Sequence, residues 1–413
     1  MKIGICGPVN LSLLEWENRP ASLPETNAFP LTSHLVNALL RRGYDVVVYT
    51  NSNSIPEPIV LHDTHLTVCV SLEMKQPGRR FYKQEIEGLK QHILAYPADI
   101  ISAFWTYEYA WAALRSGLPT VVSVHDVAYK ILLKQFDVFR FVRFLMNEIV
   151  VRKTKHLVAN SAYTYSILPA WIRKKTTIIN NFYPEHLPDL LPETIVKGNY
   201  IVSVVQGFTK RKGIPLALKA FAKLRQQHPK LEYHLIGINY EENGLAHAYA
   251  KKHNLAEGVR FLGCMTSDEL FKHVAGAKVM LHPSEEESFG MAVLEAMVAG
   301  TVVVGGKKSG FIPKLLDYGK AGILCDIRSA AAISEAAHRL LADASLRDSY
   351  ERHARRFAAQ HFSEDVIVEQ HLNYYNNVLG KTHQPTIAPE AKAQNNVIAK
   401  ASMVANVLGY TFL

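Results

Sequence analysis

Cysteine is scarce in this sequence, and no two cysteines are spaced as metal ligands. The 413 residues include four, at Cys6, Cys69, Cys264 and Cys325, all far apart along the chain. Zinc sites and disulfide-rich secreted folds need closely spaced or paired cysteines. Three of the four lie in apolar, strand-like runs, where a free cysteine packs as a small hydrophobic residue. We therefore expect no zinc site and a reducing compartment.

Long apolar runs and blocks of one charge are also absent. No stretch of 18 or more apolar residues occurs, and the start, MKIGICGPV, lacks the pattern of a signal peptide. The net charge is +9, but no segment is a dense basic run of the kind that binds nucleic acid. We expect a cytoplasmic protein that binds no nucleic acid. A modest positive field suits a small anionic substrate or an anionic membrane surface.

Strand-like and helix-like segments alternate over most of the chain, which predicts an α/β protein with parallel sheets and right-handed crossovers. The expected strands are 2–6, 44–50, 100–104, 120–124, 156–159, 177–179, 200–205, 231–236, 259–262, 279–281, 301–304 and 322–325. The expected helices are 33–42, 108–116, 138–155, 214–227, 245–253 and 267–276, the helix after residue 288, and three stretches within 329–379. A further helix is expected after Ser161, which would be its N-cap.

A proline-rich connector at 183–199 separates two such series of strands and helices. We expect a Rossmann-like domain over 1–190 and a second over 191–360. A helix at 361–380 can return to the first domain, and the structure of the tail, 381–413, stays open. Ligands of such sheets bind at the carboxyl ends of the strands, so the two domains are expected to face a shared cleft.

The segment 283–326 carries the strongest chemical signal. Glu287 and Glu295 stand eight residues apart, and the chain between them changes from loop to helix at Phe289 and Gly290. The start of a helix presents free N–H groups and a positive dipole end, which suits a phosphate. Glu295 falls on the second turn, within reach of sugar hydroxyls beside that phosphate. The pattern predicts a site for a nucleotide sugar.

Simpler interpretations of the same residues remain open on spacing alone. Ser284 and Glu287 have the spacing of a helix capping box. Glu285 and Glu286 could solvate a loop, and Glu295 could be a surface residue of an amphipathic helix.

The chain resembles glycosyltransferase family 4, the group 1 retaining glycosyltransferases of the GT-B fold. The resemblance spans about residues 1–380 and is more specific in the second domain. It rests on the pair Glu287 and Glu295 after Pro283 and Ser284, on RKG at 211–213 and VRFLG at 259–263, on VHD at 124–126, and more weakly on VANS at 158–161, IINN at 178–181 and RRGYDVVVYT at 41–50.

The resemblance implies a role for each matching residue. Glu295 would bind the donor ribose, Glu287 would lie near the donor sugar, and N–H groups of 289–292 would hold the diphosphate. Lys212 would neutralise the leaving diphosphate, and His125 would lie in the cleft near sugar and acceptor. Without the family context, the simpler interpretation is that Lys212 is a solvated charge and that His125 is a structural histidine. The implied catalytic residues are His125, Lys212 and Glu287; the implied donor-binding residues are Gly207, Arg211, Lys212, Phe289, Gly290, Met291, Ala292 and Glu295.

Three positions depart from the family pattern. The family usually has Gly-Arg where this chain has Gln206 and Gly207, so Lys210 or Arg211 would have to supply the second positive charge. The long segment 8–30 contains no glycine, whereas the family often has a Gly-Gly loop after its first strand. Pro313 is followed by Lys314 instead of a carboxylate.

These observations predict a retaining hexosyltransferase. It would move a sugar from a nucleotide diphosphate sugar to a hydroxyl acceptor: a glycan, a lipid-linked sugar or a small glycoside. No metal or cofactor is expected, because the chain has no Asp-x-Asp element and no His/Cys cluster with ligand spacing. The alternatives are a sugar-nucleotide epimerase, a phosphorylase, or a non-catalytic GT-B subunit that binds a partner. The oligomeric state, donor base, sugar and acceptor stay open.

The segment 139–155 mixes large apolar residues with arginine and lysine. Such a pattern can bind an anionic interface, which would place the protein peripherally at the inner face of a membrane. A partly buried domain helix with a basic face is the preferred interpretation.

Overall fold

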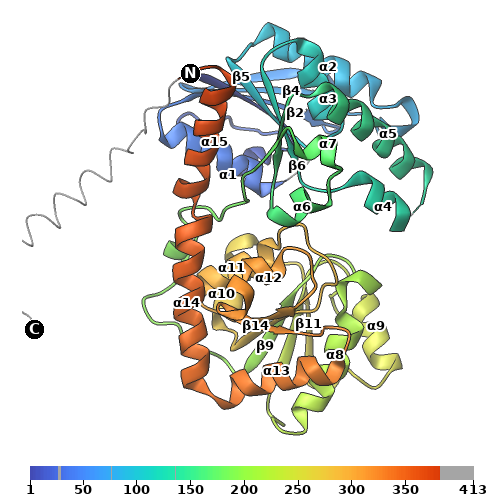
Figure 1. The fold of residues 1–413 in the computed structure, drawn as a ribbon, viewed down its shortest axis with the longest axis vertical. Coiled ribbons are helices and arrows are strands. Elements are labelled where there is room, and N and C mark those ends of the chain that lie inside the picture. The colour runs from blue at the N-terminus through green and yellow to red at the C-terminus, as the bar shows by residue number, and fades with distance from the viewer. Residues whose placement is uncertain (27–28, 76, 135, 382–413) are drawn as a thin grey trace, which may run out of the picture. The chain divides into compact units, whose positions relative to one another are not determined.

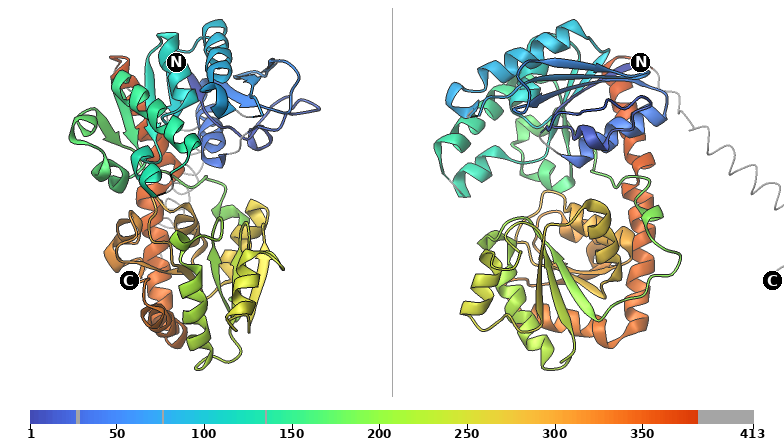
Figure 2. Two further views of the ribbon diagram at one scale, coloured as in Figure 1. Left: turned by 90° about the vertical axis from the view of Figure 1, so that its right-hand side faces the viewer. Right: turned by 180° about the vertical axis from the view of Figure 1, so that it is seen from behind.

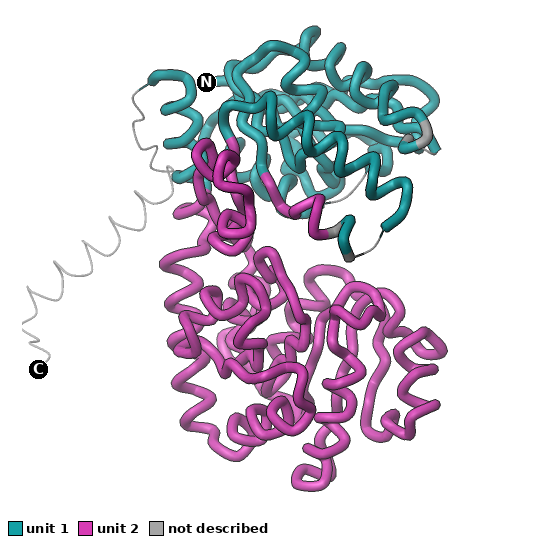
Figure 3. Tube along the Cα trace, turned by 45° about the vertical axis from the view of Figure 1, so that its right-hand side comes forward, with its two compact units in different colours: residues 1–123, 131–156, 368–413 teal, residues 124–130, 157–367 magenta. Residues whose placement is uncertain are grey.

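The computed structural model describes residues 1–26, 29–75, 77–134 and 136–381. These residues form two compact units (Figure 3). The first comprises 1–123, 131–156 and the described residues from 368 onward. The second comprises 124–130 and 157–367. The predicted tail lies outside the described residues beyond Lys381.

The first sheet has eight strands in the order β3-β4-β2-β1-β5-β6-β7-β8 (Figure 1). Its strands are β1 (Lys2–Cys6), β2 (Asp45–Ser52), β3 (Ile59–His62), β4 (Leu66–Leu72), β5 (Ile100–Phe104), β6 (Thr120–Val124), β7 (His156–Ala159) and β8 (Thr176–Ile178). β1 pairs in parallel with both β2 and β5 and is buried from Ile3 onward. β3 is an exception to the expected parallel sheet, since it pairs antiparallel with β4 through a short hairpin.

The helices of this half of the chain are α1 (Pro30–Arg41), α2 (Lys83–Ala95), α3 (Glu108–Ser116), α4 (Ala128–Lys134), α5 (Val138–Lys153), α6 (Ala162–Ile167) and α7 (Ala170–Arg173). α2 packs against α3, and α3 packs against α5, so these three helices form one layer. The sequence patterns did not predict α2, α4 or α7. Ser161 was expected to cap a helix, and its hydroxyl does accept from the Thr164 N–H at the start of α6.

The neighbouring strands of the second sheet pair in parallel, in the order β11-β10-β9-β12-β13-β14. Its strands are β9 (Tyr200–Val204), β10 (Glu232–Ile236), β11 (Val259–Gly263), β12 (Val279–His282), β13 (Val302–Gly306) and β14 (Gly322–Cys325). The strand order reverses between β9 and β12. In open α/β sheets such a reversal creates a crevice at the carboxyl ends of the strands.

Helices cover both faces of the second sheet (Figure 2). They are α8 (Ile214–Arg225), α9 (Leu245–Lys252), α10 (Ser267–Gly276), α11 (Met291–Ala299), α12 (Ile312–Leu315), α13 (Ala330–Ala342) and α14 (Ala344–Phe362), and α15 (Glu364–Val378) follows. The helices α8 and α13 share one apolar core, whereas α10, α11 and α14 share the other. This burial fixes the ends of β9 and β12, from which the two loops at the strand reversal emerge.

These two loops approach each other closely at Gly213. Its φ is +68°, and a Cβ atom there would lie 2.1 Å from the Pro283 carbonyl oxygen. The Glu285 N–H donates to the Arg211 carbonyl at 2.8 Å, which joins the same two loops. Gly207, in the β9 loop, also has a positive φ of +75°, but a Cβ atom there would meet open space.

The pair of glycines gives a matched test of this contact. We expect Gly207→Ala to cost about 1–2 kcal/mol of unfolding free energy, the penalty of a left-handed residue. Gly213→Ala should cost a further ~1–3 kcal/mol because the methyl group must displace the Pro283 carbonyl. Urea unfolding of both variants measures this, and equal losses would contradict the close approach.

Candidate functional site

The loop 283–290 leads from β12 into α11 through a glycine in a left-handed conformation. Gly290 has a φ of +103° and caps α11, and a Cβ atom there would lie 2.6 Å from Ile312 Cδ1. No side chain of the described residues caps this helix. The first N–H groups of a helix have no intrahelical acceptor, so those of Met291 and Ala292 are available to a ligand. The capping-box interpretation of Ser284 and Glu287 is therefore wrong.

The Glu287 carboxylate is the centre of a compact polar cluster. Lys212 Nζ lies 2.7 Å from Glu287 Oε1, and the Ser284 hydroxyl donates to the same oxygen at 2.6 Å. His282 Nε2 lies 3.7 Å away. The side chains of Lys212 and Glu287 are only 14% and 17% exposed. Lys212 belongs to a short 3-10 helix, Lys210–Lys212, after β9, so the ion pair joins the two loops at the strand reversal.

The charges of this cluster are well defined. Burial favours the neutral form of Glu287, yet the pKa of Glu287 lies below its ordinary value because His282, Lys212 and Ser284 favour the anion. Burial lowers the pKa of His282 to about 4. At neutral pH His282 is thus an uncharged ring, and Lys212 is the cation that balances Glu287.

Glu295 has the opposite electrostatic character. It lies half-buried on the second turn of α11, and burial raises its pKa to about 7. No hydrogen bond or ion pair of its carboxylate is found among the described residues. The interpretation of Glu295 as an ordinary surface residue is wrong, because its carboxylate is partly withdrawn from water and has no counter-charge among the described residues.

The other predicted donor-binding residues divide into main-chain and side-chain candidates. The ring of Phe289 stacks on Phe311 at 5.2 Å between centroids and belongs to the core, so only its backbone can reach a ligand. Met291 Sδ accepts from Asn181 Nδ2 at 3.7 Å, which links α11 to the IINN motif. The Gly207 carbonyl accepts from the Tyr240 hydroxyl at 3.3 Å.

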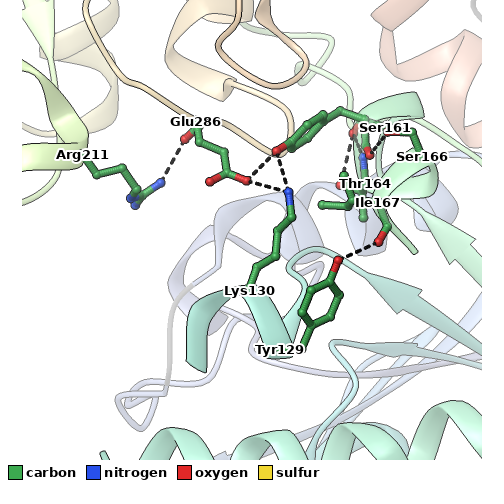
Figure 4. Close-up of polar contacts among 9 residues, drawn as sticks. Tyr129, Lys130, Ser161, Thr164, Ser166, Ile167, Arg211 and Glu286 are labelled. Carbon is green, nitrogen blue, oxygen red and sulfur yellow. Dashed lines mark hydrogen bonds and ion pairs between the residues drawn. The ribbon is translucent and has the colours of Figure 1, made fainter. Parts of the chain in front are cut away.

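A second polar network, which the sequence did not reveal, surrounds Glu286 (Figure 4). The Tyr163 hydroxyl donates to Glu286 Oε1, and Lys130 Nζ lies 3.5 Å from the same oxygen. Arg211 Nη1 donates to the Glu286 carbonyl at 3.0 Å. The neighbouring Ser161 hydroxyl donates to the Ser288 carbonyl. Glu286 is therefore held by specific contacts, which contradicts its interpretation as a solvated loop residue.

The network brings the segment 124–130 to the loop that carries Glu287. Lys130 ends this segment, and His125 is five residues before it at the end of β6. The segment groups with the second unit. His125 is half-buried, and its catalytic role stays a prediction.

The described part of the chain contains no evident set of metal ligands. No group of three or more His, Cys, Asp or Glu residues there could hold an ion. The four cysteines are free thiols. The expectation of metal independence remains a prediction.

Glu295 gives a direct test of the burial argument. A raised pKa means that the folded state binds the proton more tightly, so stability falls as pH rises from 4.5 to about 7. We expect Glu295→Gln to remove this loss and to gain up to roughly 3 kcal/mol over wild type at alkaline pH, with little difference at acidic pH. Urea unfolding of the ligand-free proteins across this range measures the difference. A pH-independent difference would contradict a buried, uncompensated carboxylate.

Two family models match the chain in its two halves. The model described as Glycosyltransferase Family 4 matches residues 31–187, and that of glycosyl transferases group 1 matches residues 192–357. Among similar proteins, the N-acetyl-alpha-D-glucosaminyl L-malate synthase of Bacillus anthracis is 27% identical over 268 residues, 63% of this chain and 68% of the relative. The glycogen synthase of Mycobacterium tuberculosis is 24% identical over 407 residues, 89% of this chain and 94% of the relative.

Solved structures share the fold. The sucrose-phosphate synthase of Thermosynechococcus elongatus matches with a TM-score of 0.71 and 18% identity, over 92% of this chain and 99% of the other. Anabaena HepE in complex with UDP-glucose matches with a TM-score of 0.61 and 18% identity, over 91% of this chain and 100% of the other. The two parallel-sheet domains are thus those of the GT-B fold.

The predicted family, fold and enzyme class are confirmed by these matches, which disfavour the epimerase and the non-catalytic subunit. The two models together span most of the chain, from the first helix to α14. The chain belongs to the family 4, group 1 glycosyltransferases and is a retaining glycosyltransferase that uses a nucleotide-sugar donor.

Proposed function

We propose that the protein transfers a hexosyl group from a UDP-sugar to a hydroxyl acceptor, with Lys212, Glu287, Glu295 and the start of α11 as its donor site. The ion pair of Lys212 and Glu287 carries the proposal, because it places a shielded cation at the strand reversal. The structural relative HepE, whose crystal structure is a complex with UDP-glucose, supports UDP as the carrier. The acceptor is a hydroxyl compound: a glycan, a lipid-linked sugar or a small glycoside.

The diphosphate is the group that this arrangement suits best. A lysine ammonium has three donors, and only one is needed for Glu287 Oε1, so two remain for phosphate oxygens. The first-turn N–H groups of Met291 and Ala292 add donors and the positive end of the α11 dipole. Since Lys212 is 14% exposed, its attraction to an anion is weakly screened.

The same groups favour departure of the nucleotide. As the bond between the anomeric carbon and the phosphate oxygen breaks, negative charge grows on that oxygen, where Lys212 and α11 stabilise it. The departing phosphate then accepts the proton of the acceptor hydroxyl, whose oxygen bonds to the anomeric carbon on the same face. Glu287 is already engaged with Lys212 and Ser284, so we assign it to hold the cation and to accept hydrogen bonds from donor hydroxyls.

Glu295 is proposed to bind the ribose. Its half-buried carboxylate offers acceptors for hydroxyl groups, and hydrogen bonds to the anion would offset the burial that raises its pKa. Such contacts act alike in the ground and transition states, so they contribute mainly to donor affinity. His125 is proposed to position the sugar or polarise a hydroxyl. Gly207, Arg211 and the backbone of 289–290 complete the proposed donor-binding set.

Lys212 can be tested against a matched lysine of the next helix. We expect Lys212→Ala to lower kcat/KM by about 10²–10³-fold, because it removes a transition-state cation. Lys219→Ala, an exposed lysine on α8, should stay within about threefold of wild type. Steady-state kinetics with the accepted UDP-sugar measures both.

The loss of Lys212 leaves Glu287 without its cation, so folding needs its own control. The double variant Lys212→Met with Glu287→Gln removes both charges and should restore stability without restoring turnover. If Lys212→Ala retained near-wild-type kinetics, the proposed role would be wrong.

The donor and the stereochemistry are tested on the wild-type enzyme. Thermal shifts with UDP-, GDP-, ADP- and TDP-sugars should be largest for a UDP-sugar, since a ligand of the folded state raises its stability. Proton NMR of the first-formed product, in a reaction run with EDTA, should show the donor's anomeric configuration. A larger shift with another base would overturn the UDP assignment, and an inverted product would overturn the proposed same-face chemistry.

A further inference from the structure

The end of α4 and the beginning of α5 form one short stretch of the first unit (Figure 1). Large apolar side chains are exposed along this stretch. Leu133, Phe136 and Val138 are 81%, 77% and 78% exposed. Phe139, Phe141 and Leu145 are exposed as well. Singly exposed apolar residues are common, but contiguous ones mark a surface that meets another phase or molecule.

The periodicity of α5 shows that this exposure is not a side effect of a buried helix. Val142, Met146 and Val150 have helical spacing and are buried in the domain. Val138, Phe141 and Leu145 have the same kind of spacing but lie on the exposed side. The preferred interpretation, a partly buried domain helix, explains why Val142, Met146 and Val150 are apolar. It does not explain the apolar residues on the exposed side. A solvent-facing helix side normally carries polar residues.

An adjacent segment extends the same surface. The Cβ position of Gly78 lies 3.2 Å from Phe139 Cδ2, so the short 3-10 helix Pro77–Arg80 adjoins α5. Phe81, which follows it, is 57% exposed. We call the resulting surface the apolar patch; its members are Phe81, Leu133, Phe136, Val138, Phe139, Phe141 and Leu145.

The charges beside the apolar patch are almost all positive. The segments 77–83 and 131–145 contain one acidic residue, Asp137, which accepts from the Arg140 N–H at 2.7 Å and pairs with the Arg140 side chain. Arg143 lies over the Tyr107 ring, 4.0 Å from its centroid. The basic residues of the two segments whose side chains the structure describes are Arg80, Lys83, Arg140 and Arg143.

We propose that the apolar patch docks onto an anionic lipid bilayer. Its apolar side chains would enter the headgroup boundary, while the surrounding arginines and lysines contact anionic headgroups. An anionic bilayer satisfies both features at once, whereas an apolar protein partner would leave the cations unmatched. Docking is interfacial, since no described helix is long and apolar enough to cross a membrane. The inference does not depend on the proposed function, because vesicle binding is measured without a sugar donor.

The experiment is flotation of the full-length protein with two kinds of vesicle. We expect binding to vesicles of phosphatidylcholine with phosphatidylglycerol, weak binding to phosphatidylcholine alone, and loss of binding at high salt. Phe136→Ser with Phe141→Ser should reduce binding at least about tenfold, because both side chains lose their apolar contact with lipid. Arg80→Glu with Lys83→Glu should reduce it only for the anionic vesicles.

The matched control is Leu94→Ser with Val196→Ser, two side chains that are 53% and 85% exposed outside the patch. This control should bind like wild type, and all variants should retain transfer to a water-soluble acceptor.

Failure of the wild type to float with anionic vesicles would overturn the proposal. Sedimentation showing a dimer that the Phe136 and Phe141 variant dissociates would instead assign the patch to self-association.

Discussion

The partly buried ion pair of Lys212 and Glu287 is the interaction on which the geometry of the site depends. It joins the loop after β9 to the loop after β12, and both partners are largely shielded from water. Removing one partner of a fully buried pair leaves an uncompensated charge and typically costs about 3–5 kcal/mol, which is an upper bound for this partly exposed pair. The two loops are therefore coupled, because a shift of either would expose or isolate a charge. The same coupling holds a cation against the loop that leads into α11 before any ligand arrives.

Backbone packing makes the ion pair possible. Gly213 lies against the Pro283 carbonyl, and a Cβ atom at Gly310 would lie 2.1 Å from the Glu287 carbonyl oxygen. The Glu287 carbonyl also accepts from the Phe311 N–H at 3.0 Å. The loop that carries Glu287 is thus held by main-chain contacts on two sides. The Glu287 side chain can therefore pair with Lys212, and the packing of the neighbouring Gly213 fixes the position of Lys212.

Local patterns predicted the strands other than β3 and β4, and they predicted the pair Glu287 and Glu295. Contacts between distant segments stayed hidden. The first and last residues of β1 and β5 could be predicted because each strand is a short apolar run with clear ends. Tyr163 and Lys130 lie 123 and 156 residues from Glu286, so no spacing rule could connect them. The capping-box interpretation failed because a hydroxyl that can cap a helix can equally donate to a carboxylate, and only packing decides between them. Exposure of Phe141 likewise depends on which side of α5 is buried.

The two glutamates show how one segment supports two electrostatic functions. Lys212 and Ser284 hold Glu287 as an anion, so its charge is compensated within the protein. Burial without a partner among the described residues raises the pKa of Glu295 to about 7, so its charge is left to be compensated by a ligand. The first carboxylate therefore orders the site, while the second makes the protein alone less stable as it ionises. Hydrogen-bond donors on a bound molecule would remove that penalty, and the binding of such a molecule is thereby linked to the stability of α11.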